Sequence, residues 1–238
     1  MLCCKPMFSP WLGILGWRWR CPALKVLFAS AIALSLCAPT PAHGQGAAYA
    51  LNGSESAQRL SQQALDCLHR GEDAVTKDAR LAAYHEGLAL AQRALQADDL
   101  NADAHFAVFA NRGRILLLEG ASVNPFNLLS VNRDLDRALE LNPNHADALA
   151  AKGGLYRQLP RLLGGSLSKA EQCLARAIEI DPNAVGARIE LAQTYSDMGE
   201  PERGVPLLRQ AAEVAERVGK YRQLAQARSL LQELAVQH

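Results

Sequence analysis

Small and apolar residues recur along this chain at offsets that fit the face of a helix. A small residue is followed by an apolar residue four positions later and by another small residue three positions after that. These offsets place all three side chains on one helical face, where a neighbouring helix can approach closely. Four triplets hold these offsets: Gly87, Ala91 and Ala94; Val131, Leu135 and Ala138; Ala170, Leu174 and Ala177; and Gly204, Leu208 and Ala211.

The positions that follow these triplets predict where the helices end. Pro143 and Pro182 each come five residues after the last small position, and proline stops a helix and restricts the residue before it. A further apolar helix precedes each triplet, so each unit is a pair of helices with one face that it cannot bury alone. The chain after residue 44 lacks the alternating Val/Ile/Thr runs and Asn-Gly or Asp-Gly turns of strands, which argues against a sheet.

These residues resemble the tetratricopeptide repeat, a helix–turn–helix unit of about 34 residues. Residues 146–215 carry the resemblance most fully, residues 102–143 carry it less fully, and in residues 56–99 only the second helix is recognisable. The resemblance implies an all-α fold, a helical-hairpin solenoid with extended loops between helices. The expected solenoid covers residues 56–238, with hairpins at 56–99, 102–143, 146–182 and 185–216 and a capping helix at 220–236.

Two hairpins are longer than the repeat, and the extra residues fall between their helices, at 119–130 and 157–166. Asn124-Pro125 resembles the start of a helix, and Ser168 to Glu171 forms a capping-box pattern that predicts another. The second insertion is rich in leucine, with Leu159, Leu162, Leu163 and Leu167. These leucines either fold back and close the edge of a groove or form an exposed interface.

The composition divides the chain at residue 44. Four basic residues and no acidic residue lie before this point, and residues 26–38 form an apolar run of 13 residues followed by Pro39 and small residues. A basic leader, a short apolar segment and a small-residue end are typical of a signal peptide. We therefore expect residues 1–44 to direct export to the periplasm, with an uncleaved membrane anchor as the alternative, and residues 45–55 to form a flexible tether.

Removal of residues 1–44 leaves 21 basic and 24 acidic residues, because four of the 25 basic residues and none of the acidic ones lie in the leader. The resulting net charge of −3 gives no electrostatic basis for nucleic-acid binding. Two of the six cysteines remain, Cys67 and Cys173. They either join in a disulfide after export or, as we expect, pack as small apolar residues.

The sequence lacks the motifs that would indicate a catalytic site, a cofactor site or a metal site. His85-Glu86 begins like a zinc-protease helix, but Ala89 stands where the second histidine would be. Gly164-Gly165-Ser166 lacks the lysine of a phosphate-binding loop, and no Gly-x-Ser-x-Gly is found. We expect a protein that is not an enzyme, with no cofactor and no metal site.

The register of the tetratricopeptide resemblance implies which side chains line a concave groove. Arginine binds carboxylates with two parallel hydrogen bonds, so arginines on this face would suit an acidic peptide, a carboxylate or the helix of a partner. The alternative is an ordinary solvated face with ion pairs within the chain. The expected groove residues are Phe106, Arg114, Arg157, Gln158, Gln193 and Asp197.

The extended segment 157–166, together with the export signal, is similar to the periplasmic tetratricopeptide component of tripartite ATP-independent (TRAP) transporters. That resemblance implies an accessory protein that docks a periplasmic solute-binding protein. The sequence otherwise predicts a scaffold that binds another protein or peptide in the cell envelope. It does not determine the oligomeric state or the identity of the partner.

Overall fold

A computed structural model describes residues 45–120 and 125–236 of the chain. The expected signal peptide, residues 1–44, lies outside the described residues. Within them the regular elements are helices and no strand is present, which confirms the all-α prediction for this part of the chain. The helices are α1 (Gln45–Asp73), α2 (Lys77–Ala97), α3 (Ala102–Glu119), α4 (Pro125–Leu141), α5 (Ala146–Gln158), α6 (Leu167–Ile180), α7 (Val185–Met198), α8 (Pro201–Arg217) and α9 (Tyr221–Val236).

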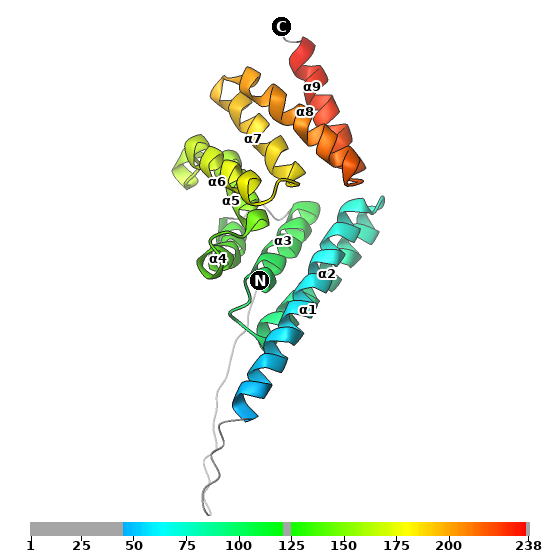
Figure 1. Ribbon diagram of the computed structural model, residues 1–238, viewed down its shortest axis with the longest axis vertical. Coiled ribbons are helices and arrows are strands. Elements are labelled where there is room, and N and C mark those ends of the chain that lie inside the picture. The colour runs from blue at the N-terminus through cyan, green and yellow to red at the C-terminus, as the bar shows by residue number, and fades with distance from the viewer. Residues whose placement is uncertain (1–44, 121–124, 237–238) are drawn as a thin grey trace, which may run out of the picture. The chain divides into compact units, whose positions relative to one another are not determined.

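Consecutive helices pack against each other as hairpins (Figure 1). The pairs are α1 with α2, α3 with α4, α5 with α6, and α7 with α8, and α9 packs on the last pair. The first helix of one hairpin also contacts the first helix of another, as α1 does with α3 and α5 with α7, and the terminal helix α9 contacts α7. The first helices therefore form one layer of the stack, and this layer carries the candidate site described below.

The small-apolar-small triplets lie at the contacts between paired helices. Every member of the triplet in α6 is fully buried, and Ala91, Ala94, Leu135, Ala138 and Ala211 have no exposed surface either. Gly153 of α5 shows why small residues are needed opposite them, because a Cβ atom built there would lie 2.5 Å from the Cγ atom of Leu174. The periodicity of the sequence thus identifies the buried seam of each hairpin.

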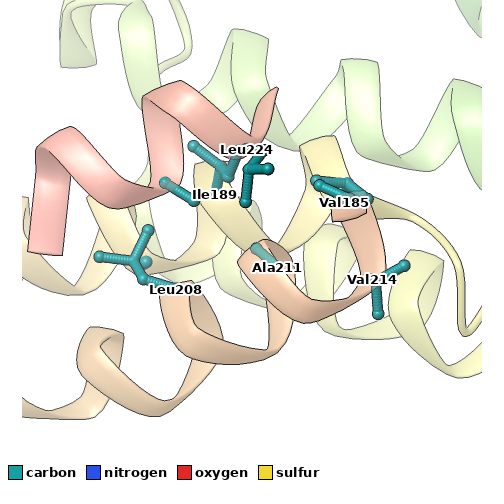
Figure 2. Packing of buried hydrophobic residues seen from close by; sticks show 9 residues of the cluster. Val185, Ile189, Leu208, Ala211, Val214 and Leu224 are labelled. Carbon is teal, nitrogen blue, oxygen red and sulfur yellow. The ribbon is translucent and has the colours of Figure 1, made fainter. Parts of the chain in front are cut away.

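The last helix covers the end of the fourth hairpin. Leu224 and Ala227 of α9 are buried against α7 and α8, and Leu231 and Leu234 pack on the same cluster. Figure 2 shows Leu224 close to Val185 and Ile189 of α7 and to residues of α8. A terminal helix of this kind removes from water an apolar face that a neighbouring hairpin would otherwise cover.

The start of the chain's first helix differs from the expected tether at residues 45–55. Helix α1 begins at Gln45 and includes this whole segment. Its sequence contains Ala47, Ala48 and Ala50, which favour helix, and Ala57 just beyond is fully buried. The tether prediction was wrong. Polar residues without an apolar period can still be helical when the same helix packs against other helices further along the chain.

Helix α4 begins where the sequence pattern indicates, and helix α6 begins earlier. Helix α4 begins at Pro125, as the Asn124-Pro125 pattern indicates, so the insertion at 119–130 is partly helical. The cap of α6 is Ser166 and not Ser168, because the Ser166 hydroxyl accepts a hydrogen bond from the Lys169 amide at 3.4 Å. The helix therefore starts two residues before the capping-box pattern predicted.

The leucine-rich turn after α5 is an exposed feature. A short 3-10 turn, η2 (Arg161–Leu163), presents Leu162 with 99% and Leu163 with 57% of its surface exposed. Backbone hydrogen bonds fix the turn, since the Gly165 amide donates to the Pro160 carbonyl and the Ser166 amide donates to the Tyr156 carbonyl. The alternative in which these two leucines close the edge of the groove is therefore wrong, because they point into solvent.

Both cysteines of the described residues carry free thiols. Cys67 is buried in α1, and Cys173 is half-buried in α6. Burial raises the pKa of both thiols above the ordinary value, and Glu86 adds to the rise at Cys67. The burial is what small apolar side chains would show, but the Cys67 sulfur also accepts a hydrogen bond from Arg70 at 3.2 Å.

Candidate protein-binding groove

The first helices of the hairpins line an open groove with a volume of about 780 Å³. Helices α1, α3, α5, α7 and α9 all contribute side chains, and α2 adds Arg80. Because these helices follow each other with the same inner face, residues three or four positions apart on each helix reach the groove. On α3 these residues are Phe106, Phe109, Ala110, Gly113, Arg114 and Leu117, and on α5 they are Asp147, Ala150, Ala151, Gly154, Leu155 and Gln158.

The floor of the groove is apolar. The rings of Phe106 and Phe109 lie with their centroids 6.1 Å apart, and Leu65, Leu68 and Leu155 border the same space. Glycines and alanines of α3 and α5 occupy most of the remaining floor. Small residues leave room for the backbone or side chains of a bound segment to come close, and apolar clefts of this size are common binding sites.

His145 fixes the part of the floor where α3 meets α5. Its ring centroid lies 4.9 Å from that of Phe106, and its Nδ1 atom accepts a hydrogen bond from the Ala148 amide at 3.4 Å. Its Nε2 atom lies 3.2 Å from a carboxylate oxygen of Asp103, and this contact lowers the pKa of Asp103. One histidine thus caps α5, contacts α3 and supports the aromatic floor.

The structure separates the six predicted groove residues into two groups. Phe106, Arg114 and Gln158 line the main groove, as the tetratricopeptide register implied. Arg157, Gln193 and Asp197 line a second, smaller pocket of about 240 Å³, which α9 completes with Leu230, Glu233 and Leu234.

Both predicted arginines bind carboxylates of their own chain. Arg114 forms an ion pair with Glu72 of α1. Arg157 donates hydrogen bonds to Glu190 at 3.0 Å and to Asp197 at 3.1 Å, both on α7. Burial lowers the pKa of Arg157, but these carboxylates outweigh it and raise the pKa above its ordinary value. The arginines join neighbouring first helices, which matches the alternative of ion pairs within the chain.

The Arg157 pairs predict a measurable contribution to stability. We expect Arg157→Ala to lower the free energy of unfolding by about 1 kcal/mol, because its side chain is only 17% exposed and its loss leaves Glu190 and Asp197 without their partner. Arg137→Ala is the control, since Arg137 pairs with Glu140 on the surface of α4 with side chains 41% and 64% exposed. Urea unfolding followed by circular dichroism measures both, and equal midpoints would contradict the prediction.

No protein-family model and no curated protein matches the chain. Solved structures with a similar backbone include PilF of Pseudomonas aeruginosa, with 18% identity and a TM-score of 0.47 over 76% of this chain and 78% of that one. TTC0263, a TPR protein of Thermus thermophilus, has 19% identity and a TM-score of 0.44 over 71% and 90% of the two chains. MamA has 19% identity and a TM-score of 0.41 over 63% and 84%. At these values the likeness does not extend to a function.

The hairpin order and the small-residue seams decide the architecture. The fold is a tetratricopeptide-like stack of helical hairpins. In this stack the first helices line the groove, and the second helices of the hairpins pack behind them. None of the described helices is both long and apolar enough to cross a membrane. The described part of the chain also contains no group of three or more His, Cys, Asp and Glu side chains placed to hold a metal ion.

Both ends of the tetratricopeptide-like groove are lined by residues that were not predicted from the sequence. Helix α1 contributes Leu65, Leu68, His69 and Glu72, although its repeat pattern is not recognisable. The spacing of these four positions is the only sequence signal for this face, since they follow each other by three, one and three residues. Helix α9, expected only as a cap, and the residue before it contribute Lys220, Arg222, Gln223 and Gln226.

Proposed function

We propose that the chain is a non-catalytic scaffold that binds a segment of another protein in the groove of its first helices. The observation that carries this proposal is the groove over α1, α3 and α5, whose lining includes the half-buried side chains of Leu65, Phe109 and Leu155 and the exposed Leu117. Apolar surface that a folded protein leaves concave and exposed is typical of an interaction site.

The layout of the groove supports a protein partner in particular. Leu117 at the end of α3 is 61% exposed and borders the groove, so its surface is available to a bound side chain. Charged residues of every contributing helix line the same groove as the apolar side chains. Protein interfaces combine apolar and charged side chains in this way, and a few buried side chains supply most of the binding energy.

The matched pair Leu117→Glu and Leu163→Glu tests this proposal. Both leucines are more than half exposed, at 61% and 57%, so neither change should alter the helix content. Only Leu117 borders the groove. We expect Leu117→Glu to weaken partner capture about tenfold or more, because it places a charge against an apolar contact, and Leu163→Glu to leave capture unchanged.

The measurement is a pull-down from envelope extract with the full chain carrying a C-terminal tag, with mass identification of what stays bound. Circular dichroism of each variant serves as the folding control. A set of bound proteins that is the same for the wild type and Leu117→Glu would contradict binding in the groove.

We also propose that the scaffold acts in the cell envelope after export. The support is the leader pattern of residues 1–44, with four basic residues, none acidic, and an apolar run of 13. N-terminal sequencing of the protein from a periplasmic fraction tests this proposal. A new terminus near residue 45 would support cleavage, and a chain that stays in the cytoplasm with Met1 in place would contradict export.

A narrower function is supported by the exposed leucine turn η2. If the chain is the accessory component of a TRAP-type uptake system, its partner is a periplasmic solute-binding protein, and the unusual segment 157–166 is a natural contact surface. Leu162 is 99% exposed on a turn fixed by backbone hydrogen bonds, which makes it a rigid apolar contact. Loss of capture by Leu163→Glu, but not by Leu117→Glu, would favour this function.

A further inference from the structure

The smaller pocket beside the main groove lies where three helices of the inner layer end. Arg157, Asp197 and Leu234 belong to the last turns of α5, α7 and α9, and all three line this pocket. Leu230 and Leu234 are half-buried, so part of the lining stays in contact with water. The apolar residues of the lining are Ala192, Leu208, Leu230 and Leu234. The pocket is therefore an apolar hollow at the edge of the stack where these helices end.

The leucine turn η2 lies at the same edge, because it continues directly from α5. Arg157 of the pocket and Leu162 of the turn are five residues apart, so their Cα atoms are separated by at most about 18 Å. The Ser166 amide donates to the Tyr156 carbonyl at 2.8 Å, which ties the other end of the turn to the last turn of α5. One edge of the chain thus carries both an exposed leucine and an open apolar pocket.

The pocket is large enough for the side chain that the turn presents. Its volume is about 240 Å³. A cavity of about 150 Å³ already holds a benzene molecule, and the side chain of leucine is smaller than benzene. Leu162 leaves 99% of its surface in water, so it does not fill the pocket of its own chain. Its transfer into an apolar pocket of another molecule is favourable, because apolar surface leaves water.

The turn is positively charged. Residues 158–170 contain Arg161 and Lys169 and no acidic residue. Both side chains are exposed, and within residues 45–120 and 125–236 neither forms an ion pair. The Lys169 ammonium lies 5.5 Å from the centroid of the Tyr156 ring. Arg161 is therefore a cation without a carboxylate partner, directly beside the exposed Leu162.

The pocket is negatively charged. Its lining holds two carboxylates, Asp197 and Glu233, and one cation, Arg157. Arg157 already donates hydrogen bonds to Asp197 and to Glu190. Glu233 accepts a hydrogen bond from the Ser229 hydroxyl at 3.1 Å, but it has no ion pair in the part of the chain that the structure describes. The pocket thus offers an exposed carboxylate to a cation from outside the chain.

We propose that two copies of the chain form a symmetric dimer, in which Leu162 of each copy enters the pocket of the other and Arg161 pairs with Glu233 of the partner subunit. Because the leucine and the pocket lie at one edge of the chain, a two-fold axis brings each leucine to the other pocket, and the contact closes with two copies. The opposite charges fix the orientation of the two copies. This dimer does not depend on what binds in the main groove.

Sedimentation velocity of the full chain tests the dimer. We expect the chain to change from one copy to two between about 1 µM and about 200 µM, with a dissociation constant on the order of 10 µM. Leu162→Glu and Leu230→Glu should each weaken association about tenfold or more, because they place a charge against the apolar contact. The control is Leu100→Glu, which changes a 62% exposed leucine in the turn before α3 and should leave association unchanged.

A charge exchange tests the orientation of the dimer. Arg161→Glu alone and Glu233→Arg alone each place like charges across the contact, so each should weaken association about tenfold. The double variant restores opposite charges and should associate within about threefold of the wild type. Both positions are exposed, so the variants should keep their helix content, which circular dichroism checks. Association through another surface would not respond to this exchange.

Three results would overturn the proposal. A wild type that stays monomeric at about 200 µM would show that the two copies do not associate and would leave η2 open for a solute-binding protein. A double charge variant that associates no better than the single variants would exclude the pairing of Arg161 with Glu233. Species larger than two copies would exclude the closed two-fold arrangement. Well below the dissociation constant the chain is a monomer, so the unfolding of variants is compared there.

Discussion

Leu174→Ala is expected to lower the free energy of unfolding by about 2–5 kcal/mol, the range for a leucine truncated in a packed core. Leu174 of α6 is fully buried and packs in one cluster with Ala170, Ala177, Leu191 and Tyr195. Truncation removes the apolar burial of the branched end of the side chain. It also leaves a cavity, because tightly packed helices collapse only partly into such a space.

The control for this prediction is the same substitution at an exposed leucine. Leu162→Ala removes the same atoms from a side chain that is 99% exposed, so the free energy of unfolding should change by less than about 0.5 kcal/mol. Urea unfolding followed by circular dichroism measures both variants. Similar midpoints for the two would show that the seam of the third hairpin is not packed as described.

Gly153→Ala is expected to lower the free energy of unfolding by about 2 kcal/mol, although alanine favours helix over glycine by about 1 kcal/mol. The added methyl group would lie 2.5 Å from the Leu174 Cγ atom and 3.2 Å from the Ala170 carbonyl oxygen. Neither neighbour can move away easily, since one is the branch point of a buried side chain and the other is backbone. Relief of the clash therefore requires α5 and α6 to separate.

Gly113→Ala should have the opposite sign. Gly113 is also inside a helix, but an added methyl group would meet only the Val131 side chain, at an ordinary contact distance of 3.9 Å. We expect a gain of about 0.4–1 kcal/mol from the less flexible unfolded chain. Thermal unfolding of the two variants side by side gives the signs, and a stabilised Gly153→Ala would contradict the close approach of α5 and α6.

The seams of the hairpins were predictable from sequence because their cause is local. The triplet of small, apolar and small residues identifies the helical face that packs closely against the paired helix. Ala170, Leu174 and Ala177 are an example. Helix α1 lacked this signal over residues 45–55, so its start was missed. Its helix depends on packing further along the chain, which no local pattern records.

The candidate site was harder to predict, because ion pairs join residues far apart in sequence. Arg157 contacts Glu190 and Asp197, which lie 33 and 40 positions later. The structure places Phe106, Arg114 and Gln158 at the main groove and the other three predicted residues at the smaller pocket. The sequence register could not show that Arg114 and Arg157 are already paired with carboxylates of the chain.

The length of the groove depends on the number of hairpins, because each hairpin adds its first helix to one layer. Each first helix adds its own inner face to the groove, and contacts join α1 to α3, α5 to α7 and α7 to the terminal helix α9. Duplication of one hairpin would therefore extend the groove by one helix while the existing seams keep their residues. Such a change would lengthen the segment that the protein can hold, and the chemistry at either end of the groove would stay the same.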